Sequence, residues 1–155
     1  LANKPVDQLE VLLNNMFATS DYGRSVPVKN LTLSLQHLAD LGLVLGVATM
    51  DSEAGIKATL GEFNCLNLFD YAVGYDSRFG SKPGPGMVLG FCQQTRLRPE
   101  QVMVVGDNTH DLYMGQSACA GFNVGVLTGT STRSELQVDA DLVLDSISDL
   151  VALWP

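Results

Sequence analysis

The sequence predicts an α/β protein, organised as a three-layer α/β/α sandwich around a mainly parallel sheet. Short, wholly apolar runs at 43–48 and 102–105 are typical of strands buried on both faces, since they lack the alternation of a half-exposed strand. Segments with apolar residues at helical spacing lie between these runs. Strands that alternate with such helices imply right-handed crossovers, which place helices on both faces of one sheet.

The boundaries of the expected elements follow from apolar spacing and from residue types that begin or end helices. Leucines recur at helical spacing over 31–41 and are followed by Gly42, a residue type that commonly ends a helix. Ser52 is the expected N-cap of the next helix, and Asn108 is the expected N-cap of the helix after the strand at 102–105. In order, the expected elements are a helix over 7–17, a linker over 19–29, a helix over 31–41, a strand over 43–48, a helix over 52–63, a strand over 71–74, a loop over 75–86, a helix over 85–96, a strand over 102–105, a helix from 108, a strand over 123–127, a loop through Arg133, a strand over 142–144 and a helix over 146–153.

Composition limits the class of protein and its partners. The 155 residues are enough for one domain with a real core, and 46% apolar with 17% charged residues is ordinary for a soluble protein. The formal charge of −8 argues against nucleic acid or an anionic membrane surface as a partner, and no apolar run has the length of a membrane span. The scattered Cys65, Cys92 and Cys119 predict buried thiols in a reducing compartment, so we expect a cytoplasmic protein.

Two aspartates follow the apolar run at 102–105. Asp107 stands at the expected carboxyl end of that strand, and Asp111 lies four residues further on, so both carboxylates can reach the same crevice above the sheet. Two carboxylates in such a crevice suit Mg²⁺, which takes oxygen ligands. The structural alternative is that Asp107 caps the following helix and Asp111 stabilises its positive end.

Thr49 and Lys82 are the other candidates for a binding site. Thr49 ends the strand at 43–48 just before a helix start, where a hydroxyl and free backbone N–H groups suit a phosphoryl oxygen. Lys82 lies in a loop that Pro83 and Pro85 stiffen, and its ammonium group can neutralise a phosphate or hold a carboxylate. The alternatives are a threonine that only closes a strand and a solvated loop lysine.

Taken together, these motifs resemble the haloacid dehalogenase superfamily, most closely its phosphoglycolate phosphatase-like branch. Thr49 in Gly-Val-Ala-Thr-Met-Asp, Lys82 in Lys-Pro-Gly-Pro, and the pair in Gly-Asp-Asn-Thr-His-Asp match the second, third and fourth family motifs in order. The resemblance implies a Rossmann-like sheet, with phosphate held by Thr49, Met50 and Lys82, although the family often has asparagine where Met50 stands. It also implies Mg²⁺ bound by Asp107 and supported by Asp111.

The family's first motif is absent from this sequence. That motif, Asp-x-Asp-x-Thr/Val after an apolar strand, supplies the nucleophile and the general acid, whereas Asp139-Ala-Asp141 precedes its strand. The resemblance therefore implies a remnant of a helical cap and a linker at 1–25, followed by a core at 26–155 that lacks its first strand. In the family's strand order that strand lies between 43–48 and 102–105. We expect an open slot there that is filled from outside or by association; the alternative is direct pairing of the two strands.

The resemblance implies a magnesium-dependent phosphomonoester hydrolase acting on a small phosphorylated metabolite such as phosphoglycolate. The chain itself is expected to be inactive, since the nucleophile is missing. A related mutase or pyrophosphatase is the alternative within the family. The alternative that is not an enzyme is a phosphate-binding or interaction module.

Overall fold

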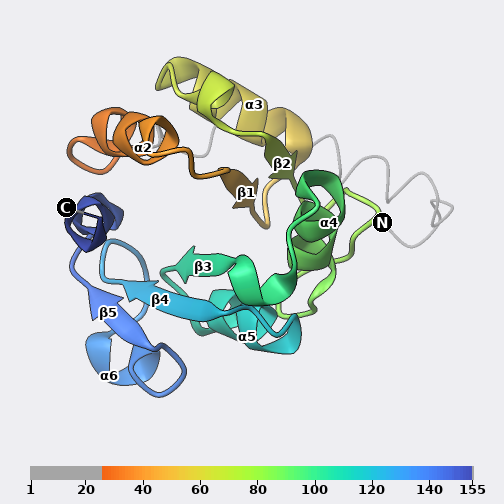
Figure 1. Cartoon of the computed structure of the whole chain (residues 1–155), viewed down its shortest axis with the longest axis vertical. Helices are drawn as coiled ribbons and strands as arrows, with labels where there is room; N and C mark the ends of the chain where they lie inside the picture. The colour runs from red at the N-terminus through yellow and green to blue at the C-terminus, as the bar shows by residue number, and fades with distance from the viewer. Residues whose placement is uncertain (1–25, 155) are drawn as a thin grey trace, which may run out of the picture.

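The structure, a computed structural model, describes residues 26–154 and contains parallel strands with helices between them (Figure 1). The helix predicted over 7–17 and most of the predicted linker lie outside the described residues. The α-helices are α2 (Leu31–Asp40), α3 (Glu53–Glu62), α4 (Gly86–Thr95), α5 (Thr109–Ser117) and α6 (Arg133–Leu136). The 3-10 helices are η1 (Leu66–Leu68), η2 (Pro99–Gln101) and η3 (Ile147–Leu153). The strands are β1 (Gly46–Ala48), β2 (Tyr71–Val73), β3 (Met103–Gly106), β4 (Phe122–Val126) and β5 (Leu142–Leu144).

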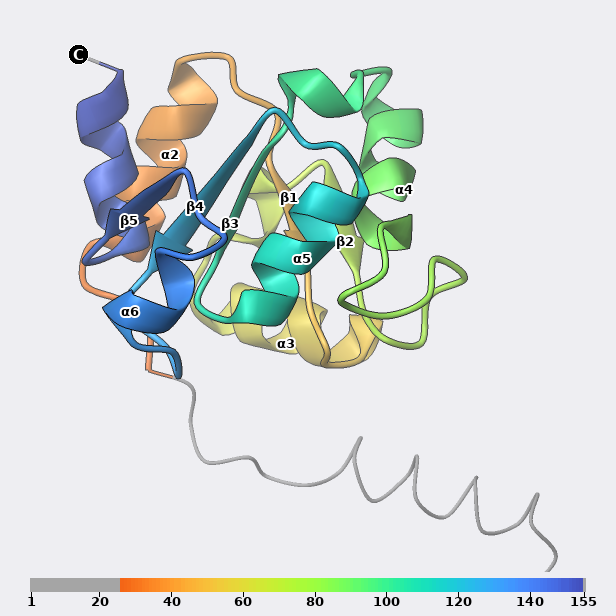
Figure 2. The ribbon, with the colours of Figure 1, turned by 90° about the horizontal axis from the view of Figure 1, so that it is seen from below.

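The predicted three-layer α/β/α class is confirmed. Figure 2 shows α5 and α6 in front of β3, β4 and β5, with α2 and η3 behind these strands. Around the other two strands, α4 packs against β1 and β2, and α3 packs against β2. Every strand pair is parallel, as expected for strands joined by helical crossovers.

The sheet is divided into two parts within the described residues. Strands β1 and β2 form one part, with Gly46 opposite Tyr71, and β3, β4 and β5 form the other, in that order. No ladder joins β1 to β3 in this part of the chain, so the alternative of direct pairing between 43–48 and 102–105 is wrong. Both strands nevertheless run in the same direction and end at the same edge (Figure 2).

Two apolar cores cover the two faces of the sheet. One includes Val73, Phe91 and Val104 and lies under α4 and α5. The other includes Leu38 and Val124 and lies under α2 and η3. Neighbouring residues of β3 contribute to opposite cores, which is why its sequence is apolar throughout.

Three expected elements differ from those observed. Strand β1 covers only half of the predicted strand over 43–48, and Val44 is 41% exposed. Both differences arise because β1 pairs with β2 along one edge, while no strand among the described residues covers its other edge. The predicted loop through Arg133 leads directly into the short helix α6, whose capping box of Thr132 and Glu135 was overlooked. The predicted closing helix is a 3-10 helix, η3.

Candidate active site

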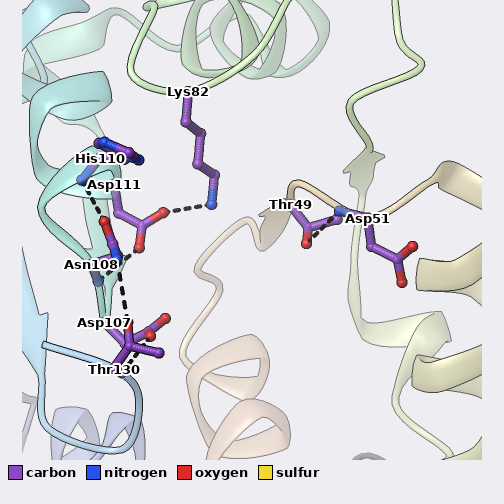
Figure 3. A network of polar contacts seen from close by, with 8 residues as sticks. All are labelled: Thr49, Asp51, Lys82, Asp107, Asn108, His110, Asp111 and Thr130. Atoms are coloured by element: carbon purple, nitrogen blue, oxygen red, sulfur yellow. Dashed lines mark hydrogen bonds and ion pairs between the residues drawn. The ribbon is translucent and has the colours of Figure 1, made fainter. Parts of the chain in front are cut away.

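The carboxyl ends of β1 and β3 bring the predicted residues to one edge of the fold (Figure 3). Thr49 directly follows β1, and Asp107 directly follows β3. Lys82 reaches this edge from the loop between β2 and α4, while Asp111 lies in the first turn of α5. Figure 3 shows Thr49 across a gap from the two aspartates, with Lys82 extending between the two sides.

Lys82 and Asp111 form an ion pair. The Lys82 Nζ atom lies 2.5 Å from Asp111 Oδ1, and only 14% and 8% of the two side chains are exposed. The other oxygen, Asp111 Oδ2, accepts a hydrogen bond of 3.1 Å from the Asn108 backbone N–H. Both carboxylate oxygens of Asp111 are therefore engaged, and the carboxylate holds the ammonium group at the edge of the gap.

Gly106, the last residue of β3, leaves the space that the Asp111 side chain occupies. A Cβ atom added at Gly106 would overlap the Cβ and carboxylate of Asp111, so no larger residue fits there without moving the aspartate. Asn108 supports the same turn as the N-cap of α5, because its Oδ1 atom accepts a hydrogen bond of 3.0 Å from the His110 N–H. The imidazole of His110 is exposed.

Asp107 is held by the loop that follows β4. Its Oδ2 atom accepts a hydrogen bond of 3.1 Å from the Thr130 N–H, and its backbone carbonyl accepts one of 3.3 Å from the Ser131 N–H. The Thr130 hydroxyl in turn accepts a hydrogen bond of 3.2 Å from Asn108 Nδ2. A side chain at Gly129 would overlap the Asp107 carboxylate, so this loop packs directly against it.

Thr49 and its neighbours form the opposite side of the gap. The Thr49 Oγ1 atom accepts a hydrogen bond of 3.2 Å from the Asp51 N–H, which turns the chain toward α3. Asp51 directs its own carboxylate away from the gap, where Oδ1 accepts a hydrogen bond of 2.7 Å from the Ser52 N–H (Figure 3). Met50 is 53% exposed, and Ser52 caps α3 as predicted by accepting a hydrogen bond of 3.1 Å from the Gly55 N–H.

Asp107 and Asp111 differ in their relation to the start of α5. Asp107 does not cap α5, because Asn108 occupies that position. Asp111 does lie in the first turn of α5, in a capping box with Asn108, so it stabilises the helix start as well as binding Lys82. Its position is therefore compatible with both a structural and a functional role.

The residues at this edge provide part of a metal site. Asp107 and Asp111 offer the hard oxygen atoms that Mg²⁺ prefers, and Mg²⁺ commonly binds through one or two carboxylates together with waters and substrate phosphates. The described residues contain no group of three or more His, Cys, Asp or Glu side chains arranged to hold a metal ion. Since Asp111 is already bonded at both oxygens, Asp107 is the better direct ligand.

Sequence reasoning overlooked Asn108 and Thr130 as members of this network. The available signal was the position of Thr130, which follows the apolar strand β4 and so lies at the same edge as Asp107. Ligands in open α/β sheets bind beyond the carboxyl ends of the strands, so the loop after every strand is a candidate.

Comparison with known proteins identifies the family of this chain. A family model described as haloacid dehalogenase-like hydrolase matches residues 8–126. The chain belongs to the haloacid dehalogenase-like hydrolase family. Its relatives include the phosphoglycolate phosphatase of Psychrobacter arcticus, which is 25% identical over 97% of this chain and 66% of its own length. They also include the pyrophosphatase PpaX of Bacillus mycoides, which is 29% identical over 77% of this chain and 56% of its own length.

A solved structure shares the fold of this chain. The crystal structure of a predicted phosphoglycolate phosphatase from Haemophilus somnus matches all of this chain and 69% of its own chain, with a TM-score of 0.84 and 22% identity. At this identity the match shows the fold alone. The chain spans less than two thirds of the length of the two curated relatives described above.

Among residues 26–154, no helix is both long enough and apolar enough to cross a bilayer.

Proposed function

We propose that this chain carries the phosphate-binding and metal-binding part of a magnesium-dependent phosphomonoester hydrolase. The observation that carries the proposal is the meeting of Thr49, Lys82 and Asp107 at one edge of parallel strands, around a gap. The relatives named as phosphatases support hydrolysis of a phosphate bond. We favour a small phosphorylated metabolite such as 2-phosphoglycolate, because the phosphoglycolate phosphatase relative matches 97% of this chain.

Lys82 and Thr49 would hold the phosphoryl group from two sides. An ammonium group has three N–H donors, and Asp111 accepts from one of them, so Lys82 can donate to phosphoryl oxygens without leaving its carboxylate partner. The Thr49 hydroxyl accepts from the Asp51 N–H and is left with its own hydrogen to donate. Met50 would contribute its backbone N–H rather than its exposed side chain. Such positioning and charge neutralisation make up most of the catalysis of phosphoryl transfer.

Asp107 would be the direct Mg²⁺ ligand in this site, and Asp111 would support it by holding Lys82 and the start of α5. When bound, the metal ion would neutralise charge on the phosphoryl oxygens. The Thr130 N–H fixes the Asp107 carboxylate, and this hydrogen bond leaves Asp107 Oδ1 to face a ligand. Other ligands would have to come from water, from the substrate or from a further segment of polypeptide.

The described residues do not supply a nucleophile in this arrangement. The Asp111 carboxylate is bonded at both oxygens, the Asp107 carboxylate has the role of metal ligand, and the Asp51 carboxylate lies against the start of α3. A covalent route needs an attacking carboxylate aimed into the gap. The 155-residue chain by itself is therefore proposed to bind phosphate without turning over phosphate esters.

We place this chemistry in the cytoplasm. Cys65 and Cys92 are buried free thiols as predicted, whereas the prediction of a buried thiol is wrong for Cys119, which is exposed because it follows the end of α5. Free thiols are kept in reducing compartments. Burial raises the pKa of both the Cys65 and the Cys92 thiol, so neither is suited to act as a thiolate nucleophile.

Titration with 2-phosphoglycolate and with glycolate tests the proposed phosphate site. The two ligands differ only in the phosphoryl group, so amide NMR signals of Thr49, Lys82 and Asp107 should shift with the phosphate ester and not with the alcohol. Lys82→Gln should weaken this binding by about tenfold or more, since hydrogen bonds to charged groups contribute about 1.5–3 kcal/mol. Lys57→Gln, an exposed lysine on α3, is the matched control. Equal shifts with both ligands, or unchanged binding in Lys82→Gln, would contradict the proposal.

A further inference from the structure

The turn after β1 contains three consecutive backbone N–H groups that donate to side chains. The Asp51 N–H donates to Thr49 Oγ1 over 3.2 Å, and the Ser52 N–H donates to Asp51 Oδ1 over 2.7 Å. Both bonds are local, because each acceptor lies within two residues of its donor. The third bond is different, since the Glu53 N–H donates over 3.0 Å to Oδ1 of Asp76, 23 residues further along the chain. Of the three acceptors, only Asp76 belongs to another part of the fold.

Asp76 lies in the loop between β2 and α4, which also carries Lys82. This loop is fixed to the rest of the protein at two other points. Asp111 holds the Lys82 ammonium group. In the middle of the loop, the Phe79 ring packs against the core under α4, with its centroid 6.0 Å from that of the Tyr71 ring. Asp76 therefore belongs to a segment whose position does not depend on α3.

Gly74 brings this loop and the turn after β1 into direct contact. A Cβ atom added at Gly74 would overlap both the Asp51 carbonyl oxygen and the Glu53 nitrogen, so no larger residue fits without moving the backbone. The Tyr75 N–H donates a hydrogen bond of 3.0 Å to the same Asp51 carbonyl. The Asp76 carboxylate thus completes a junction in which the two backbones already touch.

The turn after β1 depends on this junction because the strand itself is held along one edge only. Among residues 26–154, β1 pairs with β2 alone, over three residues. Thr49 adds one more bond, of 3.1 Å, from its N–H to the Val73 carbonyl. Beyond Thr49 the chain leaves the sheet, so the contacts with residues 74–76 fix the turn relative to the loop that carries Lys82.

We propose that Asp76 is a positioning residue for the Thr49 hydroxyl. Its carboxylate fixes the turn after β1 to the loop of Lys82, so that the two groups proposed to hold phosphate keep a set separation across the gap (Figure 3). The inference rests on the proposed phosphate site and adds to it a residue that acts without touching the ligand. Without the carboxylate, the turn and the loop move relative to each other, and binding weakens because both groups must contact one phosphoryl group.

Two other roles of Asp76 predict different results. A role in helix stability alone would come from its negative charge beside the first turn of α3, and it would leave phosphate binding unchanged. A purely electrostatic effect on the site would have the opposite sign, because a carboxylate repels phosphate and its removal would strengthen binding. Only positioning predicts that binding weakens when the hydrogen-bond acceptor is lost and not when the charge alone is lost.

Two substitutions in the full 155-residue chain separate the acceptor from the charge. Asp76→Ala removes both, whereas Asp76→Asn removes the charge and keeps an oxygen that can accept from the Glu53 N–H. Binding of 2-phosphoglycolate, followed by amide NMR signals, should weaken about threefold or more in Asp76→Ala and stay within about twofold in Asp76→Asn, as expected for one hydrogen bond. Without ligand, the Glu53 N–H should exchange with solvent faster in Asp76→Ala only.

Two further variants test whether Asp76 acts through Thr49. Ser52→Ala removes the local cap of α3, a hydrogen bond of 3.1 Å from the Gly55 N–H, but leaves the junction with the loop intact. It should lower the melting temperature and keep phosphate binding within about twofold of the unmodified chain. In a Thr49→Ala background there is no hydroxyl to position, so adding Asp76→Ala should weaken binding by less than about 1.5-fold.

Several outcomes would overturn the inference. They are unchanged or tighter binding in Asp76→Ala, equal losses in Asp76→Ala and Asp76→Asn, a loss in Ser52→Ala as large as in Asp76→Ala, and an undiminished effect in Thr49→Ala. Asp76 is exposed, so its variants are expected to fold, and an unfolded Asp76→Ala protein would show a structural role instead. If the unmodified chain binds no phosphate ester, the proposed function fails together with this inference. If it binds the ester but does not respond to Asp76→Ala, the inference alone fails.

Discussion

The Nζ atom of Lys82 lies 2.5 Å from Oδ1 of Asp111, and this contact joins the loop before α4 to the first turn of α5 across 29 residues of sequence. The pair lies at the boundary between the two parts of the sheet and lines the cavity between them. One Lys82 donor is therefore taken up by Asp111, and the other donors of the ammonium group are available to the proposed phosphate.

Removing one partner of the ion pair should destabilise the protein. In Asp111→Asn, the Lys82 ammonium would lose its carboxylate while only 14% exposed, and breaking a buried pair costs roughly 3–5 kcal/mol. The free energy of unfolding, measured by urea denaturation, should fall by an amount near the lower end of that range. Asp145→Asn is the matched control, because its ion pair with Arg133 is exposed: 52% of the Arg133 side chain and 82% of the Asp145 side chain are accessible. This substitution should change the free energy of unfolding by less than about 1 kcal/mol. Equal effects of the two substitutions would contradict the prediction.

A side chain at residue 106 should displace Asp111. In Gly106→Ala the new methyl group would overlap the aspartate, so we expect a loss of about 1–3 kcal/mol in stability together with weaker phosphate binding. Gly61→Ala in α3 is the control, because its Cβ would meet no atom within 4 Å and alanine favours the helix by roughly 0.5–1 kcal/mol. The melting temperature should therefore fall in Gly106→Ala and rise in Gly61→Ala. A stabilised Gly106→Ala protein would show that Asp111 has room to move.

Magnesium should bind only weakly to this chain alone. The described residues provide two carboxylates at the site, and one of them is already bonded at both oxygens. Mg²⁺ gives up its hydration water reluctantly and usually binds with the help of substrate phosphates, which are missing when the chain is titrated alone. Titration calorimetry should show millimolar or weaker binding, and Asp107→Asn should abolish it. A tight, stoichiometric isotherm that is unchanged in Asp107→Asn would place the metal elsewhere.

The 155-residue chain should not hydrolyse an aryl phosphate. Without a nucleophile the covalent route is closed, and general acid–base catalysis contributes typically about 10²–10⁴-fold by itself. The assay compares the chain with a longer polypeptide in which a strand ending in Asp-x-Asp precedes it. Sustained turnover by the short chain that disappears in Asp107→Ala would mean that the nucleophile lies within these residues. Turnover that persists in Asp107→Ala would instead reveal a contaminating enzyme.

The buried hydroxyl of Tyr71 should make stability depend on alkaline pH. The Tyr71 hydroxyl donates a hydrogen bond of 3.0 Å to the Met87 carbonyl, and burial raises the pKa of Tyr71 to about 12 from its ordinary value of 10.0. A raised folded-state pKa gives stability that is full below pH 10 and is lost as the pH rises through 12. Tyr71→Phe should lower the free energy of unfolding by about 1 kcal/mol at neutral pH. Between pH 10 and pH 12 the variant should lose less of this free energy than the unmodified protein does.

The control for this alkaline effect is Tyr75→Phe, because Tyr75 is an exposed tyrosine close to the same strand. Its stability should stay within about 0.5 kcal/mol of the unmodified protein at every pH. Denaturation with urea across the alkaline range compares the three proteins. An identical decline in Tyr71→Phe and in the unmodified chain would show that another group titrates there.

The sequence by itself determined the local features of this protein. Ser52 and Asn108 cap their helices as predicted, Gly42 follows α2 with a positive φ of 82°, and Asp107 stands at the end of its strand. These features depend on residues within about one turn of each other, so the spacing of residue types is enough to predict them. The same spacing indicated the α/β/α class, because the apolar runs and the helices alternate along the chain.

Only the tertiary structure decided which of these features meet. The Lys82–Asp111 pair and the hydrogen bond from Thr130 to Asp107 join residues that are more than 20 positions apart. Within residues 26–154, β1 and β3 each keep one edge without a partner strand. Sequence spacing does not encode such contacts, since they depend on how helices and strands pack around two shared cores. For the same reason the apolar run at 43–48 gave only half of its predicted strand: an apolar sequence favours a buried strand, but a neighbouring strand is needed to bury it.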